Sequence, residues 1–347
     1  MGNRAMMQNV GGYGARMGAA ALLWMSAVAA VQAADFPATE PAIKQFIETT
    51  AREQQIPVEQ VRRAVEAATF QPSIIAAISK PAEKRLRWDE YRNLFMQQSR
   101  IDKGADFVMQ NLPAMERAER EYGVPREIIA AIIGVETGYG ANTGKYRVVD
   151  ALGTLAFRYP ARSAFFSKEL SAYLKLTSEQ KLDPLAYKGS YAGAMGYPQF
   201  MPSSYRAYAV DYTGDGIRDI WNSPADAIGS VAHYFQAHGW KSGESVVLTA
   251  TGPQQPPEGL DYNRPEAPYR TVAELEAKGI HGSAALPADT RVIPLAFELS
   301  DGSVEYDIGL HNFYVITRYN HSPLYAMAVT SLAKQIQNTL AQRQAQH

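Results

Sequence analysis

Apolar residues recur every three or four positions through much of this chain, which is the spacing of amphipathic helices. Ile43 and Ile47 mark one apolar face, and Val58, Val61 and Val65 mark a second. The same spacing continues further along the chain. The additional predicted helices are 88–112, one starting near 113, 125–136, 150–157, 162–176, 203–212, 224–238 and 323–340. The sequence therefore predicts a mainly α protein.

Near the C-terminus the pattern changes to alternation, which is typical of strands. Residues 292–299 and 304–307 alternate on either side of Ser300-Asp301-Gly302 and predict a β hairpin. Residues 311–319 are predicted as a third strand. The five prolines between 251 and 270 exclude regular structure there, so that segment is predicted to be a linker or a long surface loop.

The first 33 residues are predicted to be a secretory signal peptide. Arg4 and Arg16 give the segment a positive start, residues 18–31 are apolar, and Val31-Gln32-Ala33 offers small residues for cleavage. The apolar stretch is short for a bilayer-spanning helix, and an uncleaved anchor is the alternative. The mature chain is therefore expected to be soluble and exported.

The chain has no cysteine, and its charges nearly cancel. Disulfides, cysteine catalysis, thiolate metal sites and a lipidated cysteine anchor are therefore excluded. Subtracting Arg4 and Arg16 from 34 basic residues leaves 32 against 35 acidic ones, a net charge of −3 after the predicted cleavage. With this near balance of charges, the sequence lacks the excess of basic residues that is typical of nucleic-acid-binding proteins.

Glu136 is a carboxylate at the end of an otherwise apolar helix. Ile128, Ile129, Ile132 and Ile133 precede it at helical spacing, so Glu136 continues the face expected to be buried. Burial raises the pKa of a carboxyl group, and the carbonyl-rich end of a helix acts in the same direction. The general acid of a glycosidase needs this environment. A partly exposed glutamate without a special role is the competing interpretation.

The sequence Glu-Thr-Gly-Tyr-Gly at 136–140 resembles the catalytic motif of lytic transglycosylases, which cleave the glycan strands of peptidoglycan. Residues 190–205, 227–235 and 316–320 resemble further motifs of the B-type, or family 3, of these enzymes. The resemblance implies a lysozyme-like catalytic core with a helical N-terminal part, an EF-hand-like loop and a small C-terminal β element. The expected parts are a signal peptide (1–33), the helical N-terminal part (34–120), the catalytic core (121–250) with its calcium-type loop (211–226), a Pro-rich linker and surface segment (251–290), and a β hairpin with a closing helix that completes the groove (291–347).

The resemblance also implies a set of substrate-binding residues. Ser190 is expected to orient the substrate's acetamido group or Glu136, and Gln199 to contact sugar; a local turn hydrogen bond is the alternative for Ser190. Relatives often have two adjacent arginines where this chain has Ala161-Arg162, so Arg162 alone is expected to contact substrate there. The other residues expected to line the groove are Tyr91, Tyr234, Tyr319, Asn320 and Tyr325.

A glycosidase that uses two carboxylates needs them about 5 to 9.5 Å apart. The nearest candidate in sequence, Asp150, is better interpreted as a helix N-cap. The resemblance implies that the acetamido group of N-acetylmuramic acid (MurNAc) attacks its own anomeric carbon while Glu136 protonates the leaving oxygen. Glu136 then removes the C6 hydroxyl proton, which closes a 1,6-anhydro ring without water and without a cofactor.

Residues 211–219 reproduce the first nine positions of an EF-hand calcium loop. Asn222 stands where the loop usually has a bidentate glutamate, so Asp226 is expected to complete the shell. The expected ligands are Asp211, Thr213, Asp215, the carbonyl of Ile217, and Asp226. The loop is predicted to bind structural Ca²⁺, with Na⁺ or a solvated Asp-Gly turn as alternatives.

These observations predict a soluble periplasmic lytic transglycosylase that binds peptidoglycan glycan strands and carries no lipid anchor. A hydrolytic muramidase, in which another acid positions water, is one alternative. A calcium-stabilised peptidoglycan-binding protein without catalysis is the other. Cell-wall synthesis and division proteins are candidate partners.

Overall fold

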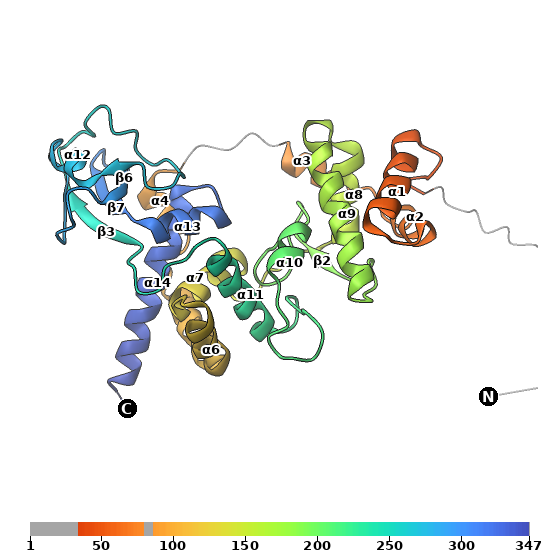
Figure 1. The fold of residues 1–347 in the computed structure, drawn as a ribbon, viewed down its shortest axis with the longest axis horizontal. Helices are drawn as coiled ribbons and strands as arrows, with labels where there is room; N and C mark the ends of the chain where they lie inside the picture. Colours follow the sequence, from red (N-terminus) through yellow and green to blue (C-terminus); the bar gives the residue numbers. More distant parts are fainter. Residues whose placement is uncertain (1–33, 80–85, 347) are drawn as a thin grey trace, which may run out of the picture. The chain divides into compact units, whose positions relative to one another are not determined.

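A long C-terminal helix, α14 (Pro323–Gln344), packs along the helices that surround Glu136 (Figure 1). The helices that it contacts are α4 (Trp88–Asn93), α5 (Gln98–Gln110), α7 (Arg126–Thr137) and α13 (His311–Tyr319). The computed structural model describes residues 34–79 and 86–346, and the predicted signal peptide (1–33) lies outside them. The predicted closing helix is confirmed.

The N-terminal helices cover a pair of long helices. This group consists of α1 (Pro41–Gln54), α2 (Val58–Glu66), α3 (Pro72–Ile78), α8 (Val148–Arg158) and α9 (Ser163–Glu179). Helices α8 and α9 pack on each other, and α1, α2 and α3 pack on this pair. Prolines begin α1 and α3, where the missing backbone donor leaves no helical hydrogen bond unmade.

Helix α11 (Pro224–Ala237) is at the centre of a second group of helices. It packs against α6 (Leu112–Tyr122), α7 and α10 (Pro202–Tyr208), and α10 in turn packs against α9. A short ribbon formed by β1 (Tyr146–Arg147) and β2 (Lys188–Gly189) leads into the 190–199 turn. The prediction of a mainly α fold is confirmed. Within the described residues, no helix combines the length and apolarity needed to cross a bilayer.

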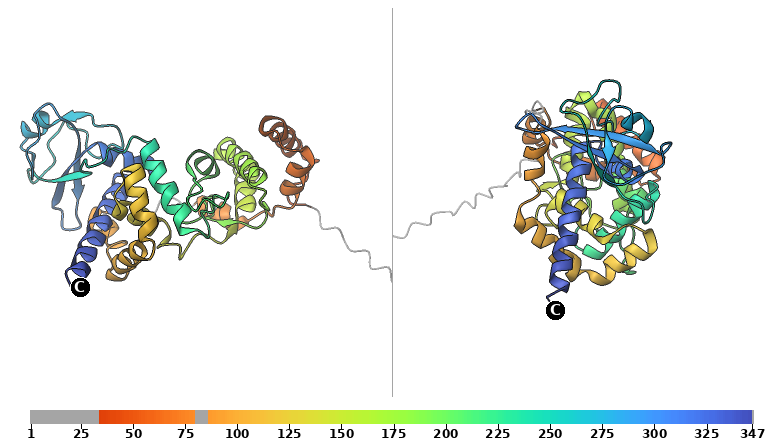
Figure 2. Two further views of the ribbon diagram at one scale, coloured as in Figure 1. Left: turned by 60° about the horizontal axis from the view of Figure 1, so that its bottom comes forward. Right: turned by 90° about the vertical axis from the view of Figure 1, so that its left-hand side faces the viewer.

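A five-stranded antiparallel sheet lies between α11 and α13 along the chain (Figures 1 and 2). Its strand order is β4-β6-β7-β3-β5. Its strands are β3 (Val247–Thr251), β4 (Arg270–Thr271), β5 (His281–Gly282), β6 (Arg291–Glu298) and β7 (Val304–Gly309). One face packs on the main core, and the other builds a small second core with α12 (Val272–Glu276). The predicted hairpin is confirmed by β6 and β7.

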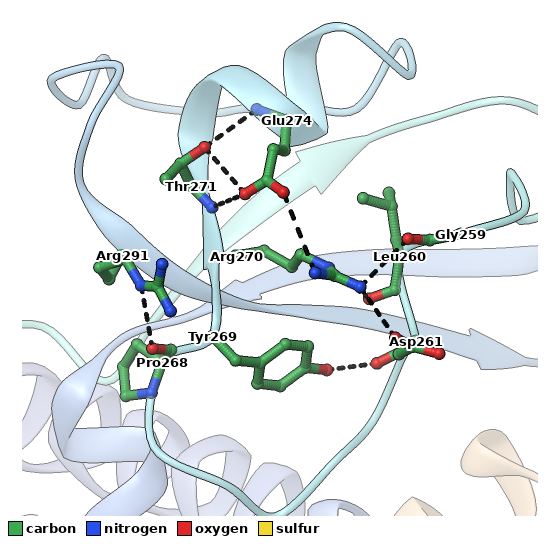
Figure 3. A network of polar contacts seen from close by, with 9 residues as sticks. All are labelled: Gly259, Leu260, Asp261, Pro268, Tyr269, Arg270, Thr271, Glu274 and Arg291. Atoms are coloured by element: carbon green, nitrogen blue, oxygen red, sulfur yellow. Dashed lines mark hydrogen bonds and ion pairs between the residues drawn. The ribbon is translucent and has the colours of Figure 1, made fainter.

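Hydrogen bonds join residues of the proline-rich segment to one another and to strand β4 (Figure 3). Arg270 donates to the carboxylate of Asp261 at 2.8 Å and to the carbonyl of Gly259 at 3.2 Å, and the Tyr269 hydroxyl donates to the carbonyl of Asp261. Thr271 and Glu274 form a capping box that starts α12. Within the predicted linker and surface segment at 251–290, residues 252–269, 277–280 and 283–290 lack helices and strands, and the rest supplies strands of the sheet and helix α12.

Two other predictions are wrong. Residues 311–319 form helix α13 instead of a third strand. Asn312, Phe313 and Ile316 share one buried face at helical spacing, and the side chain of Asn312 bonds to backbone atoms of Lys241, so burial outweighs the strand preference of the aromatic and β-branched residues. The predicted helix 88–112 is interrupted at residues 94–97, and the extended Gln97 stands at the N-cap position of α5.

Asp307 on β7 is a buried carboxyl group that the sequence did not single out. Leu295 and Thr249 lie opposite it on the neighbouring strands, and Glu305 lies on the same face. Within the described residues, one of its carboxyl oxygens is buried with no hydrogen-bond partner. Burial, and secondarily the charge of Glu305, raises the pKa of Asp307 to about 7.

We expect Asp307→Asn to change how stability depends on pH. The folded pKa of about 7 lies above the unfolded value of roughly 3.9, so the folded state holds the proton longer and the wild type loses stability as pH rises from 4 to 7. An asparagine cannot ionise, and the variant should gain up to roughly 4 kcal/mol over the wild type between pH 4 and pH 8. Urea unfolding at several pH values measures this. The exposed Asp289→Asn is the control, and parallel curves for Asp307→Asn and wild type would contradict the assignment.

Candidate active site

Glu136 lies in the last turn of α7, one of the most buried helices of the protein. The helix ends at Gly138, whose backbone is left-handed (φ 59°), and the amides of Gly138 and Tyr139 bond back to the last turn. A side chain at Gly140 would meet the ring of Tyr197 at 2.2 Å. The glycines of the 136–140 motif therefore let the chain turn sharply and bring the 190–199 turn close to the glutamate.

The carboxylate of Glu136 accepts a hydrogen bond of 2.6 Å from the hydroxyl of Tyr325 on α14. Burial raises the pKa of Glu136 to about 7, and the Tyr325 hydrogen bond opposes this rise because it stabilises the ionised form. At neutral pH the group is thus close to equally protonated and ionised. The sequence prediction of a raised pKa is confirmed, and burial is its main cause.

The charge of Glu136 acts on three tyrosines. Burial first, and then this charge, raise the pKa of Tyr91, Tyr319 and Tyr325, and Tyr325 bonds directly to the carboxylate. Tyr319 donates to the carbonyl of Pro198 at 2.6 Å and is thereby fixed against the 190–199 turn. Tyr91 is half-buried and packs against the ring of Phe95. The structure therefore brings together three of the predicted groove residues.

Asp150, the nearest carboxylate to Glu136 in sequence after the motif, is bonded at the start of α8. It lies in the first turn of α8, where Arg147 is the N-cap residue, so the predicted N-cap assignment is wrong by three positions. Its buried carboxylate accepts from the amide of Thr69 at 2.9 Å and from the guanidinium of Arg147 at 2.8 Å. Asp150 thus joins α8 to the chain after α2, and no carboxylate of the described residues contributes to the pKa shift of Glu136.

The side chains of Ser190 and Gln199 stabilise the 190–199 turn through hydrogen bonds to its backbone. The Ser190 hydroxyl oxygen accepts from the amides of Ala192 and Ala194, which is the local turn bonding left open as an alternative. Gln199 donates to the carbonyls of Gly196 at 2.9 Å and Thr143 at 3.2 Å. The turn is anchored to α7 because the Thr137 hydroxyl donates to the carbonyl of Tyr197 at 3.1 Å.

The remaining predicted groove residues have different surroundings. Tyr234 is buried, its hydroxyl donates to the carbonyl of Arg318 at 2.7 Å, and its ring lies 4.8 Å from that of Tyr319. Asn320 is exposed directly after Tyr319. Arg162 is exposed at the end of the short helix η1 (Pro160–Arg162) and stacks over the ring of Phe165; no contact of the described residues joins it to the Glu136 cluster.

Two cavities adjoin the tyrosine cluster. One, of about 370 Å³, is lined by Glu136 together with residues of α5 and of the turn after α7. The other, of about 840 Å³, is lined by Tyr91 and by residues of α4, β6 and the start of α14. A carboxyl group with a near-neutral pKa that lines a cavity of about 370 Å³ can donate a proton to a ligand and recover it. The sequence did not single out Arg100 and Lys103 in the smaller cavity, because spacing along a helix does not reveal what faces it across the fold.

The loop at 211–226 has part of the predicted metal geometry. The carboxylate of Asp211 accepts from the amides of Gly214, Asp215 and Gly216, so the loop closes around it. Asp226 is buried and accepts from three backbone amides at the two ends of the loop. The charge of Asp211 contributes to the raised pKa of Asp226; within the described residues no three acidic or histidine side chains gather into a metal site. The donors present fit an oxygen-preferring cation only in part.

Comparison with known proteins gives consistent matches over most of the chain. Residues 38–334 match the family model described as a transglycosylase SLT domain. The chain is 40% identical to the membrane-bound lytic murein transglycosylase B of Escherichia coli K12 over 310 residues, which cover 86% of this chain and 83% of that protein.

Solved structures match equally well. The soluble lytic transglycosylase SltB1 of Pseudomonas aeruginosa, in its catenated form, is 49% identical with a TM-score of 0.82, covering 86% of this chain and 98% of that one. The E. coli lytic transglycosylase Slt35 in complex with calcium is 40% identical with a TM-score of 0.80, covering 89% and 96%. These matches confirm the predicted lysozyme-like, mainly α fold.

We expect Tyr325→Phe to raise the pKa of Glu136 further, because the hydrogen bond that favours its ionised form is lost. Carboxyl carbon resonances in ¹³C-labelled protein, followed across pH, measure the change. Tyr173→Phe also removes a buried hydroxyl that donates to a carbonyl, and serves as the control. An unchanged or lower pKa of Glu136 in Tyr325→Phe would contradict the role assigned to this hydroxyl.

Proposed function

Because this chain belongs to the SLT transglycosylase family, as a B-type lytic murein transglycosylase, we propose that Glu136 performs its reaction alone, as acid and then as base. The bond cleaved is the β-1,4 link from MurNAc to N-acetylglucosamine (GlcNAc), and the product ends are 1,6-anhydro-MurNAc. The observation that carries this proposal is the Glu136 carboxyl group, which has a pKa raised to about 7 by burial, bonds to the Tyr325 hydroxyl and lines a cavity. A carboxyl group with a pKa near 7 can both donate and accept a proton at neutral pH, and the reaction requires both transfers.

In the first step, protonated Glu136 donates its proton to the oxygen that leaves MurNAc C1. The 2-acetamido oxygen of the same sugar attacks C1, and an oxazolinium ion forms as the C–O bond breaks. No carboxylate of the described residues acts on the pKa of Glu136, which supports a substrate group in the place of a second acid. As Glu136 becomes ionised, the Tyr325 hydroxyl stabilises its charge.

In the second step, ionised Glu136 removes the proton from the C6 hydroxyl of the same MurNAc. The C6 oxygen then attacks C1, the acetamido group is released, and Glu136 is again protonated. Burial supports this step as well, because a carboxylate in an apolar setting regains a proton readily. A site from which the bound glycan excludes water would favour the intramolecular attack over hydrolysis.

The contacts of the predicted substrate residues suggest distinct roles. Tyr91 and Asn320 are open to ligand, whereas the hydroxyl of Tyr319 and the amide of Gln199 already bond the protein and are proposed to shape the groove. Tyr234 is proposed to act through Tyr319, which it contacts. Ser190 can still donate its hydroxyl proton to the acetamido group. Arg162 is proposed to contact a more distant part of the glycan.

The protein is further proposed to work in the periplasm, after removal of residues 1–33, and without a lipid anchor. The leader composition and the lack of cysteine support this. Peptidoglycan glycan strands are the proposed partner. Cell-wall synthesis and division proteins remain candidate partners. A hydrolytic muramidase is the second candidate function, and the products of the reaction separate the two.

We expect Glu136→Gln to lower kcat by at least about 10³-fold, because both proton transfers are lost. Wild-type digests of sacculi, analysed by mass spectrometry, should contain 1,6-anhydro ends, which are lighter by one water than reducing ends. Glu127→Gln is the matched control, since Glu127 lies on the same helix and burial also raises its pKa. Reducing MurNAc ends from the wild type would identify a muramidase, and retained turnover in Glu136→Gln would identify a different acid.

We also propose that the 211–226 loop holds a structural Ca²⁺, or Na⁺, through Asp211, Thr213, Asp215 and the carbonyl of Ile217, with Asp226 beneath them. The loop pattern supports this, as does the calcium complex of the relative Slt35. The cation would tie down the loop and take no part in the chemistry.

We expect chelator-treated protein to melt at a lower temperature than protein with added Ca²⁺, because binding to the folded state alone raises stability. Asp215→Ala should abolish this difference and the heat of Ca²⁺ binding in isothermal titration. The exposed Asp289→Ala should retain both. An Asp215→Ala protein that binds and melts like the wild type would reject the site.

A further inference from the structure

The short helix α4, which carries Tyr91, is joined to the sheet by a polar contact that the proposed reaction does not use. The indole N–H of Trp88 donates to one carboxylate oxygen of Glu305 on β7 at 2.9 Å, and the guanidinium of Arg92 donates to the other at 3.3 Å. Trp88 and Arg92 are four residues apart and share one face of the helix, and Tyr91 lies in the same turn. Glu305 therefore bonds to the residues on either side of Tyr91.

Trp88 depends on Glu305 because its indole is inside the protein. The side chain is 1% exposed, and its ring lies 5.7 Å from that of Phe297, which stands directly opposite Glu305 on the neighbouring strand. The guanidinium of Arg92 lies 5.4 Å from the centre of the Trp88 ring. A buried N–H that loses its acceptor is costly, and a charged acceptor makes the stronger hydrogen bond. Removing the carboxylate would thus favour a different position of the indole and of the helix that carries it.

The other polar contacts between α4 and the hairpin are at the surface. Arg87 pairs with Glu298 at 3.1 Å, and the amide of Ser300 donates to the carboxylate of Asp89 at 3.1 Å. Exposed pairs of this kind contribute little to stability. Helix α4 has six residues, and so short a helix has little stability of its own. Its orientation is therefore set by its packing on α14 and by the contact with Glu305.

Tyr91 is the residue of α4 that links this contact to the active site. Its side chain is half-buried, and its ring lies 5.4 Å from that of Phe95. Tyr91 and Trp88 both line the cavity of about 840 Å³. The charge of Glu136 acts on the Tyr91 hydroxyl. A rotation of α4 would therefore move Tyr91 relative to the acid.

We propose that Glu305 is a positioning residue, which fixes α4 so that Tyr91 meets the glycan beside Glu136. The inference rests on the proposed function, in which Tyr91 is open to ligand. A side chain that is already in place need not be ordered when the substrate binds, which favours binding. Loss of Glu305 should therefore raise KM. The kcat should change little, because Glu136 keeps its hydrogen bond from Tyr325.

The test is a double-mutant cycle between Glu305 and Tyr91, with the rate read from all new chain ends formed in soluble glycan strands. Glu305→Ala should raise KM about five- to tenfold and change kcat less than about twofold. In a Tyr91→Ala background the same substitution should raise KM by less than about twofold, because the positioned ring is already absent. Glu305→Gln keeps an acceptor for Trp88 and should raise KM less than Glu305→Ala does.

Asp106→Ala is the matched control. It removes a carboxylate that pairs with Arg343 at 2.8 Å and so joins α5 to α14, and Asp106 lines neither cavity. The variant should keep the wild-type KM. A similar rise of KM for Asp106→Ala would show that any loss of contact with α14 is enough, and would overturn the specific role of Glu305.

An equal rise of KM for Glu305→Ala in both backgrounds would also overturn the proposal, as would a lower melting temperature with an unchanged KM. Should Glu305→Ala not fold, Arg92→Gln takes its place in the cycle, since it removes one of the two bonds to Glu305 at a more exposed residue. It should raise KM only where Tyr91 is present. Failure of the proposed reaction is seen separately, in the chemical form of the ends made by the wild type, because the cycle counts anhydro and reducing ends alike.

Discussion

The burial of one carboxyl group against one tyrosine is the interaction on which the site depends. Glu136 stands at the end of α7, and Tyr325 reaches it from the first turn of α14. The other walls follow from this pair, since α14 packs on α4 and α5, which carry Tyr91 and Arg100. A change in how α14 docks would therefore alter the acid, the tyrosines and Arg100 together.

The pKa of Glu136 is a balance of two opposed effects. Burial raises the pKa of Glu136 and so favours its neutral form, whereas the hydrogen bond from Tyr325 lowers the pKa and so favours the ionised form. A value near 7 suits a group that must give up a proton in one step and recover it in the next. Asp307 shows the other outcome: among the described residues no donor reaches one of its buried carboxyl oxygens, and its ionisation opposes folding.

The sequence predicts those parts of the structure that depend on local spacing. Helices α1, α2, α11 and α14 and the β6–β7 hairpin follow from apolar periodicity and a turn at 300–302. The prediction of a strand at residues 311–319 is wrong because side chains that favour strands are buried there on one face of a helix. Glu136 could be identified from its apolar neighbours, but its bond to Tyr325 joins residues 189 apart, and that contact follows from the packing of α14 rather than from either local pattern.

Among the described residues that line its cavity, Glu136 is the only acidic one, and Arg100 and Lys103 lie on the same lining. Placing a second carboxylate of the protein near Glu136 would satisfy Arg100 and Lys103, but its charge would raise the pKa of Glu136 further and hinder the base step. In the proposed mechanism the substrate supplies the missing group, the acetamido oxygen that attacks C1. This group is present only when MurNAc is bound, so the free enzyme keeps an acid poised for the first proton transfer.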